Sequence, residues 1–158
     1  MKVSKQYLLT GIIVSQLFSQ QSFAEITASS SNDDGNHPSN TLDGSLLTRW
    51  SAKGDGQWIK YDLGSSQKID DIDIAFYKGD ERYAYFDIEL SSNNAHWTQV
   101  YSGMSQKKAS LQNFNITDQS ARYVRIVGHG NSANPWNSLT EVKINTLGCL
   151  LYTSDAAD

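Results

Sequence analysis

The chain has almost no cysteine and little proline: its 158 residues include one Cys and two Pro. The single cysteine, Cys149, lies near the C-terminus, so no intramolecular disulfide can form and packing rather than cross-linking must stabilise the fold. Basic residues are also fewer than acidic ones, with 13 Lys and Arg against 17 Asp and Glu. A net charge of −4 argues against nucleic acid or an anionic membrane surface as the main partner.

Catalytic motifs are missing as well. The three histidines, His37, His96 and His129, do not have the paired spacing of a helical metal site. The sequence contains neither a Gly-x-Ser-x-Gly nucleophile motif nor a phosphate-binding loop. Asp80 and Glu81 are adjacent, so they cannot flank a glycosidic bond at the separation that two catalytic carboxylates need. We therefore expect a chain that binds rather than catalyses.

The N-terminus, residues 1–24, has the features of a secretory signal peptide. A basic start with two lysines is followed by a mostly apolar run over residues 7–18. The small residues Ser22 and Ala24 fit a cleavage site directly after them. The apolar run is shorter than the roughly 20 residues of a membrane span. The sequence therefore predicts a secreted protein, extracellular or periplasmic, without a membrane span.

The C-terminal end, residues 146–158, does not continue the pattern of the domain. From Leu147 onward the alternation of apolar and polar residues stops, and the stretch resembles translated vector or adapter sequence. We exclude it from the fold prediction and expect a truncated gene product that was formerly linked to a catalytic domain. Residues 25–145 remain as one domain, which is long enough to bury a core.

No segment of this domain shows the 3.6-residue period of an amphipathic helix. Instead, apolar residues alternate with polar ones over short runs separated by Gly, Asn, Ser and Asp. The alternation breaks at Ile69, which indicates a bulge there. Such runs are typical of sandwiches and barrels, so we predict an all-β, eight-stranded antiparallel β-sandwich of the jelly-roll type. The predicted strands span residues 26–29, 58–63, 68–76, 83–91, 97–102, 110–116, 121–128 and 139–144.

Five motifs follow one another in an order that resembles the discoidin-like, or F5/8 type C, domain. They are Leu42–Trp50 (Leu-Asp-Gly-x3-Thr-Arg-Trp), Gln57–Gly64, Phe86–Ser91, Ala121–Ile126 and Leu139–Val142. The resemblance covers residues 26–144 and implies the galactose-binding-domain-like sandwich of family-32 carbohydrate-binding modules. Residues 75–82 and 128–136 are most similar to the modules attached to bacterial alginate lyases.

A calcium site is predicted at the first of these motifs. Asp43 supplies a carboxylate, Gly44 permits a tight turn, and Thr48 offers a hydroxyl and a carbonyl. These are the hard oxygen ligands that Ca²⁺ prefers. In the resembling modules a glutamate from the last strand closes the cage, and Glu141 stands at that position. The resemblance also implies carbonyl ligands from Asn40, Ser45 and Thr140, in a site that is structural.

A sugar site is predicted in two loops that this fold brings to one end of the sandwich. Trp136 follows a proline in a polar loop and is the best candidate for stacking on a sugar ring. Arg82 and Lys78 would hold the carboxylates of a uronic acid, and His129 and Asn131 would bind hydroxyls. The full predicted set is Tyr77, Lys78, Asp80, Arg82, His129, Asn131, Asn134 and Trp136.

The remaining tryptophans and two of the arginines are expected to be structural. Trp50 should fill the sandwich beneath the metal, and Trp58 and Trp97 should begin core strands. Arg122 and Arg125 lie within a predicted strand, where we expect intramolecular ion pairs.

The resemblance implies a non-catalytic, monomeric module that binds polysaccharide, with alginate or another uronic-acid polymer first, and that targets an attached polysaccharide lyase. Two alternatives remain open: a module for neutral galactosides, and a discoidin-type adhesion domain that binds protein or lipid. Exposed apolar hairpin tips are typical of the lipid-binding domains. The tips expected here, residues 93–94 and 105–108, are polar, which favours the carbohydrate-binding module.

Overall fold

The computed structural model describes residues 22–32 and 34–148, so most of the predicted signal peptide and residues 149–158 lie outside the described residues. The described part contains strands and one short 3-10 helix, η1. Its elements are β1 (Glu25–Ala28), η1 (Pro38–Leu42), β2 (Trp50–Lys53), β3 (Gln57–Phe76), β4 (Ala84–Ser91), β5 (Thr98–Met104), β6 (Gln112–Asn131) and β7 (Trp136–Thr146). Within this part, no helix has the length and apolar character needed to cross a membrane.

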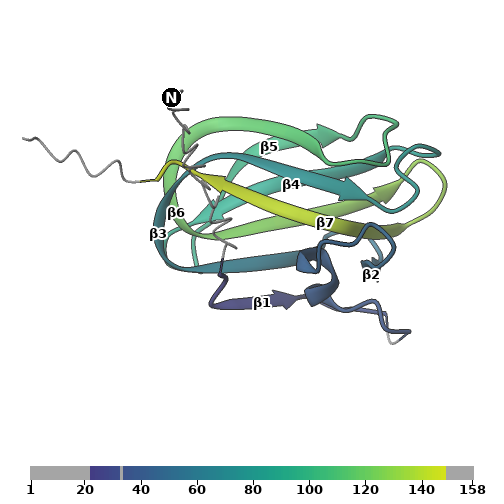
Figure 1. Ribbon diagram of the computed structural model, residues 1–158, viewed down its shortest axis with the longest axis horizontal. Coiled ribbons are helices and arrows are strands. Elements are labelled where there is room, and N and C mark those ends of the chain that lie inside the picture. The colour runs from purple at the N-terminus through teal and green to yellow at the C-terminus, as the bar shows by residue number, and fades with distance from the viewer. Residues whose placement is uncertain (1–21, 33, 149–158) are drawn as a thin grey trace, which may run out of the picture.

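Two long strands, β3 and β6, shape the molecule (Figure 1). Each has 20 residues, and the two pair antiparallel over most of their length. Their register shifts between Asp62 and Gln67, where Gly64 has a φ of 78°, a left-handed conformation that favours glycine. The pair therefore bends and carries one continuous antiparallel sheet from one layer of a sandwich into the other.

Each layer takes half of these two strands. The first layer has the strand order β1-β3-β6-β4-β5 and uses β3 up to Asp62 and β6 from Tyr123 onward. The second layer has the order β2-β7-β3-β6 and uses the other halves. The described strands thus form a two-layer antiparallel β-sandwich, which confirms the predicted all-β class.

The described residues form seven strands, whereas the sequence predicts eight. Two pairs of predicted strands, 58–63 with 68–76 and 110–116 with 121–128, are each one continuous strand, because the chain bends without losing its pairing. Strand β2 is missing from the prediction, because the sequence assigns its first residue, Trp50, to the Thr-Arg-Trp motif and not to a strand. The predicted bulge at Ile69 is confirmed by a register shift directly after this residue.

The apolar residues of the alternating runs meet between the layers. The ring of Phe86 in the first layer lies 5.1 Å from that of Phe76 and 4.9 Å from that of Phe114, both in the second layer. Aromatic pairs of this kind stabilise a core beyond the area that they bury. Trp50 is 1% exposed, and its indole N–H donates to the carbonyl of Ser30 at 2.9 Å, so it fills the sandwich as predicted.

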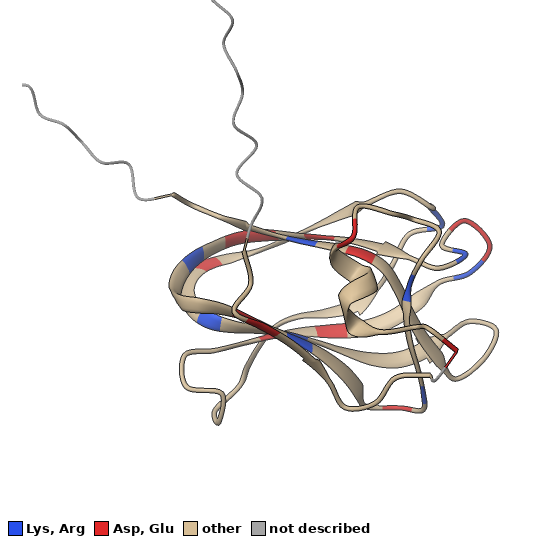
Figure 2. Ribbon diagram, turned by 60° about the horizontal axis from the view of Figure 1, so that its bottom comes forward, with Lys and Arg blue, Asp and Glu red and all other residues tan. Residues whose placement is uncertain are grey.

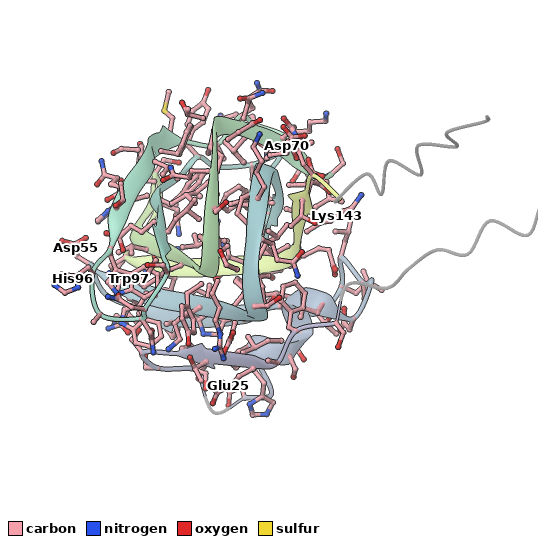
Figure 3. All side chains as sticks on the ribbon, turned by 90° about the vertical axis from the view of Figure 1, so that its left-hand side faces the viewer. Glu25, Asp55, Asp70, His96, Trp97 and Lys143 are labelled. Atoms are coloured by element: carbon pink, nitrogen blue, oxygen red, sulfur yellow. The ribbon has the colours of Figure 1, made fainter. Side chains whose placement is uncertain are left out.

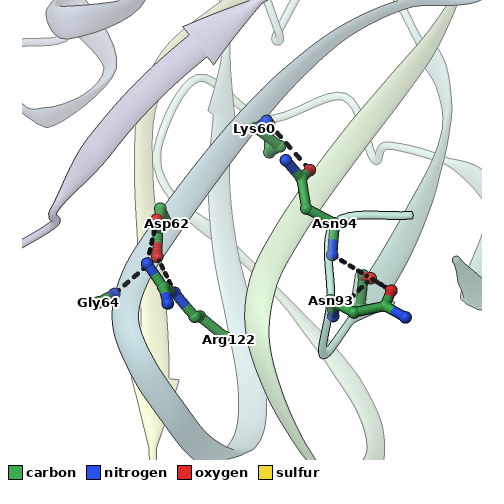
Figure 4. A network of polar contacts seen from close by, with 7 residues as sticks. Lys60, Asp62, Gly64, Asn93, Asn94 and Arg122 are labelled. Carbon is green, nitrogen blue, oxygen red and sulfur yellow. Dashed lines mark hydrogen bonds and ion pairs between the residues drawn. The ribbon is translucent and has the colours of Figure 1, made fainter. Parts of the chain in front are cut away.

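Acidic and basic residues are interspersed on the sandwich (Figure 2), and two arginines on the outer face of the first layer form ion pairs. Arg122 donates two hydrogen bonds to Asp62, at 2.8 and 2.9 Å, which hold the pKa of that carboxyl below its usual value (Figure 4). Arg125 donates to Glu89 at 2.6 Å, and its guanidinium lies 4.0 Å from the ring centroid of Trp97. The predicted intramolecular ion pairs are confirmed. Trp97 is half-buried on this side of the molecule rather than in the core (Figure 3).

Residues near both ends of the described domain pair with β3 on either side of its bend. The N–H of Ala24 donates to the carbonyl of Asp62 at 2.8 Å, and Phe23 packs against the core, although both residues fall in the predicted signal peptide. The N–H of Leu147 donates to the carbonyl of Lys68 at 2.9 Å. Ordered pairing therefore extends two residues beyond the predicted boundary at 145, because the end of β7 still has a ladder partner in β3.

Candidate functional site

A cavity of about 200 Å³ opens at the end of the sandwich opposite that bend. The residues that line it come from loops and strand ends far apart in the sequence. They are Asn32, Arg49, Ser51, Tyr77, Arg82, Asn134, Trp136 and Ser138. Half of this set, namely Tyr77, Arg82, Asn134 and Trp136, belongs to the predicted sugar site, so the structure brings the two predicted loops together around one cavity.

Two guanidinium groups gather around one tyrosine ring in this cavity. The Cζ of Arg49 lies 4.0 Å from the ring centroid of Tyr77, and that of Arg82 lies 5.5 Å from it. The Nε of Arg82 also donates to the carbonyl of Tyr77 at 3.3 Å, and the Nε of Arg49 donates to the hydroxyl of Ser51 at 3.1 Å. The ring faces and these bonds orient both side chains, and each guanidinium keeps further N–H donors.

The loop before β7 is fixed by its own amide groups. The side chain of Asn131 donates to the carbonyl of Trp136 at 2.7 Å and accepts from the N–H groups of Ala133 and Asn134, at 2.9 and 3.0 Å. Gly130, at a φ of 80°, turns the chain into this loop. Trp136 is half-buried at the start of β7, so one part of its ring packs while another remains accessible. The asparagine thus positions the tryptophan without lining the cavity itself.

The cavity has an uncompensated positive charge. No Asp or Glu lines it, and neither Arg49 nor Arg82 forms an ion pair with a residue of the described ranges. Guanidinium groups bind carboxylates with two parallel hydrogen bonds. Together with the Trp136 ring and the amide of Asn134, they give the cavity the groups needed to hold a small anionic ligand with an apolar face.

Lys78 and Asp80, which were also predicted for the sugar site, do not line this cavity. The ammonium of Lys78 lies 3.3 Å from the carboxylate of Glu81, three residues along the same exposed turn. Asp80 is exposed on that turn. The prediction placed the second cation at Lys78, whereas the structure places Arg49 beside Arg82.

His129 points away from the cavity and is held between two carboxylates. Its Nδ1 lies 2.6 Å from Asp55, and its Nε2 lies 3.0 Å from Asp87. The bond to Asp55, followed by the bond to Asp87, raises the pKa of His129 above its usual value. A protonated imidazole donates from both nitrogens, so the described carboxylates already use both of its hydrogen-bonding positions.

Arg49 was missed because its sequence neighbourhood points elsewhere. It precedes Trp50 in the Thr-Arg-Trp motif, which the sequence connects with the metal and the core. It reaches the cavity because β2 pairs with β7, with Trp50 opposite Leu139. That pairing joins residues about ninety positions apart, and β2 is not among the predicted strands.

The predicted metal ligands gather at the end of η1. Asp43 follows the helix, and Gly44 turns the chain with a φ of 74°. The carboxylate of Asp43 accepts from the hydroxyl of Thr48 at 2.5 Å and from the N–H of Ser45 at 2.8 Å. The carboxylate of Glu141, on β7, accepts from the N–H of Gly44 at 3.1 Å. The carboxylates of Asp43 and Glu141 therefore both lie at this turn.

The electrostatics of this turn suit a cation. Burial raises the pKa of Glu141 to about 7, and the negative charge of Asp43 adds to this effect. No ion pair within the described ranges neutralises either carboxylate. The buried hydroxyl of Thr140 has no hydrogen-bond partner within the described ranges. The side-chain amide of Asn40 donates to the carbonyls of Gly35 and Arg49.

No cluster of three or more His, Cys, Asp or Glu side chains suited to a metal occurs in the described residues. A Ca²⁺ ion at this turn would therefore have two carboxylates, and its remaining ligands would be hydroxyl and carbonyl oxygens, a mixture that Ca²⁺ accepts. The donor set present fits the ion.

The fold and the cavity define a ligand-binding β-sandwich. A family model of the F5/8 type C domain matches residues 25–142, and the chain therefore belongs to the F5/8 type C domain family. Among curated proteins it is similar to BTB/POZ domain-containing protein 9 of Drosophila melanogaster, at 32% identity over 110 residues, which cover 58% of this chain and 15% of that protein.

Solved structures narrow this assignment to the family-32 carbohydrate-binding modules (CBM32). The chain is similar to the CBM32 of AlyQ in complex with 4,5-unsaturated mannuronic acid, with 47% identity and a TM-score of 0.76 over 80% of this chain and 97% of that one. It is also similar to a truncated AlyQ with CBM32 and alginate lyase domains, with 46% identity and a TM-score of 0.76. That match covers 82% of this chain and 34% of the AlyQ chain. This chain is a carbohydrate-binding module of the CBM32 type.

Proposed function

We propose that this module binds polysaccharides built from uronic acids, with alginate as the first candidate, and that it does so without catalysis. The pair of unneutralised guanidinium groups at Tyr77 carries the proposal, because a uronic acid brings one carboxylate per sugar ring. The AlyQ module, which is 47% identical, has been solved with an unsaturated mannuronic acid. This relationship supports the same class of ligand here.

The cavity suggests how such a sugar would be held. Arg82 and Arg49 would share its carboxylate, while Trp136 would pack against the apolar face of the ring. Asn134 would bind hydroxyls from the rim. At about 200 Å³ the cavity is smaller than the roughly 300–1,000 Å³ of drug-sized sites, which favours a single sugar unit as the occupant.

The placement of the chain ends supports a targeting role. The first and last described residues lie at the bend of β3, opposite the cavity, so a domain attached at either end would leave the cavity open. AlyQ itself combines a CBM32 with an alginate lyase domain. We infer that this module directs an attached lyase to its polymer, and that the predicted signal peptide places it outside the cytoplasm.

We also propose a structural Ca²⁺ at the turn of Asp43, Ser45 and Thr48, closed by Glu141. The observation that favours it is the pair of carboxylates at one turn, with the pKa of Glu141 raised to about 7. A divalent cation would relieve the repulsion and fix the loop that leads into β2. Titration of calcium into chelator-treated protein should show one site. Glu141→Gln should weaken it, while Asp80→Asn, which removes the charge of an exposed carboxylate on the turn after β3, should not.

Calorimetry with short alginate oligosaccharides tests the sugar proposal. Binding in the micromolar to millimolar range is expected, because the site is small and solvent-exposed. A neutral galactan serves as the comparison ligand and anionic vesicles as the second. Binding of the galactan alone would support the neutral-sugar alternative, and binding of the vesicles alone would support an adhesion domain; either result would overturn the proposal.

A further inference from the structure

A second cavity, of about 450 Å³, lies outside the site described above. It opens between the edge strand β5 and the first half of β6, where β6 pairs only with β3 among the described strands. The loop of residues 105–111, which joins β5 to β6, forms its rim. Among the described strands, no strand pairing joins β5 to this half of β6, and the cavity lies at the gap between them.

The groups in the second cavity suit a sugar with a negative charge. The ring of Tyr101 stacks on Phe86 at 5.3 Å with an interplanar angle of 27°, which holds it in place. Met104 is 53% exposed beside it, and Asn115 contributes an amide. Lys108 brings a positive charge, with no Asp or Glu among the lining residues and no ion pair to a residue that the structure describes.

The rim is built in advance of any ligand. Gln112 is 5% exposed; its side-chain oxygen accepts from the N–H of Gln106 at 2.7 Å, and its nitrogen donates to the carbonyl of Lys108 at 3.0 Å. The N–H of Ser105 donates to the carbonyl of Ala84 at 2.9 Å. A loop held in this way loses little conformational freedom when it binds.

The two cavities are connected by touching loops. The chain at Gly79 lies so close to the carbonyl of Lys108 that an added Cβ would overlap with it. Between the cavities, the ammonium of Lys107 lies 5.2 Å from the ring centroid of Tyr83. Tyr83 directly follows Arg82, which lines the first cavity. A path with aromatic and positively charged groups therefore leads from one cavity to the other.

We propose that the second cavity is a further subsite for the anionic polysaccharide, so that one polymer chain extends from the first cavity over Lys107 to Lys108. This inference rests on the proposed function. A single uronic acid cannot contact both cavities at once, whereas a longer oligosaccharide can. The second contact is then intramolecular, and it strengthens binding through its high effective concentration.

Calorimetry on the full chain with a monouronate and with long alginate oligosaccharides tests the subsite. The double variant Lys107→Ala/Lys108→Ala should bind long oligosaccharides roughly three- to tenfold more weakly, the loss expected for two solvent-exposed charge contacts. Its affinity for the monouronate should be unchanged. The control is Lys68→Ala/Lys143→Ala, which removes the same charge from two exposed lysines outside both cavities and should change neither affinity.

Equal affinities of the Lys107/Lys108 variant and the unaltered protein for long oligosaccharides would overturn the subsite. An equal loss for both ligand lengths would also overturn it, because it would show a general electrostatic effect. In either case the monouronate would still bind and the proposed function would stand. Absence of uronate binding at every length would refute the proposed function instead.

Discussion

Charged side chains are paired differently on the outer face of the first layer and at the loop end of the sandwich. The loop end is the end that holds the first cavity and the turn after η1. On the outer face, Arg122 pairs with Asp62 and Arg125 with Glu89, each through hydrogen bonds of 2.6 to 2.9 Å. At the loop end, two guanidinium groups share one tyrosine ring, and two carboxylates share one turn. None of these four loop-end groups has an opposite charge within the described chain.

This difference distinguishes charges that stabilise the folded state through ion pairs from charges that remain available to bind a ligand. A paired charge is already satisfied, so its removal weakens the folded state and leaves binding unaffected. An unpaired and partly buried charge costs stability unless a ligand neutralises it. The loop end carries both signs in this condition, which points to an anion at the arginines and a cation at the carboxylates.

Calcium withdrawal should give the largest effect at the loop end. An ion that binds only the folded state stabilises it by about 2.7 kcal/mol at a hundredfold and about 4.1 kcal/mol at a thousandfold excess over its dissociation constant. A chelator should therefore lower the melting temperature clearly, and Asp43→Ala should abolish the response. Asp80→Ala, which removes an exposed carboxylate from another loop, should keep it. Identical melting curves with and without chelator would refute the calcium site.

Replacing an unpaired arginine, Arg82, and a paired arginine, Arg125, by alanine should give the next largest effects. Arg82→Ala should weaken uronate binding by about 1.5–3 kcal/mol, roughly 10- to 150-fold, the range for hydrogen bonds to a charged group. Its melting temperature should hardly change. Arg125→Ala should show the reverse, with a lower melting temperature and unchanged affinity. The comparison fails if both variants lose affinity to the same extent in calorimetry.

A smaller effect is expected from the acidic partner on the outer face. Glu89→Gln keeps the shape of the side chain but removes the charge that faces Arg125. It should lower the free energy of unfolding by about 1 kcal/mol, because the two side chains are 22% and 19% exposed and solvent still screens part of their interaction. Urea denaturation measures this change, and uronate affinity should stay the same. A loss of affinity would show that the outer face belongs to the binding surface.

The pH dependence of the calcium-free protein should show the smallest effect, since solvent screens a partly exposed carboxyl. The pKa of Glu141 is about 7 in the folded protein and 4.5 for an unperturbed glutamate. The folded state holds the proton more tightly, so stability should rise as the pH falls from about 7 towards 4.5. Melting curves with chelator at pH 5 and pH 8 measure this trend. Glu141→Gln should remove that part of it, and an unchanged slope in this variant would contradict the assignment.

With calcium present, the stability of the protein should instead fall as the pH is lowered, through the same carboxyl of Glu141. The ion needs the ionised carboxylate, so protons compete with it and its affinity should fall below about pH 7. Calorimetric titration of calcium at two pH values checks the competition. This experiment links the stability of the loop end to the charge of one side chain.

The sequence by itself determined the β-sandwich class and many of the residues that fill its core. Ile59 and Tyr61, and likewise Ile72 and Ile74, alternate with polar neighbours, and all four are fully buried. A period of two places alternate side chains on opposite faces of a strand, so the core face can be read without tertiary information. The sequence also indicated Trp136, the only tryptophan that follows a proline in a polar loop.

Only the tertiary structure decided which charges remain unpaired. Arg49 enters the cavity through the pairing of β2 with β7, and His129 is held away from it by Asp55 and Asp87. These contacts join residues separated by tens of positions, and local alternation carries no information about them. Whether an arginine stabilises the fold or faces a ligand depends on which carboxylate the folded chain places beside it, and that is a property of the assembled sandwich.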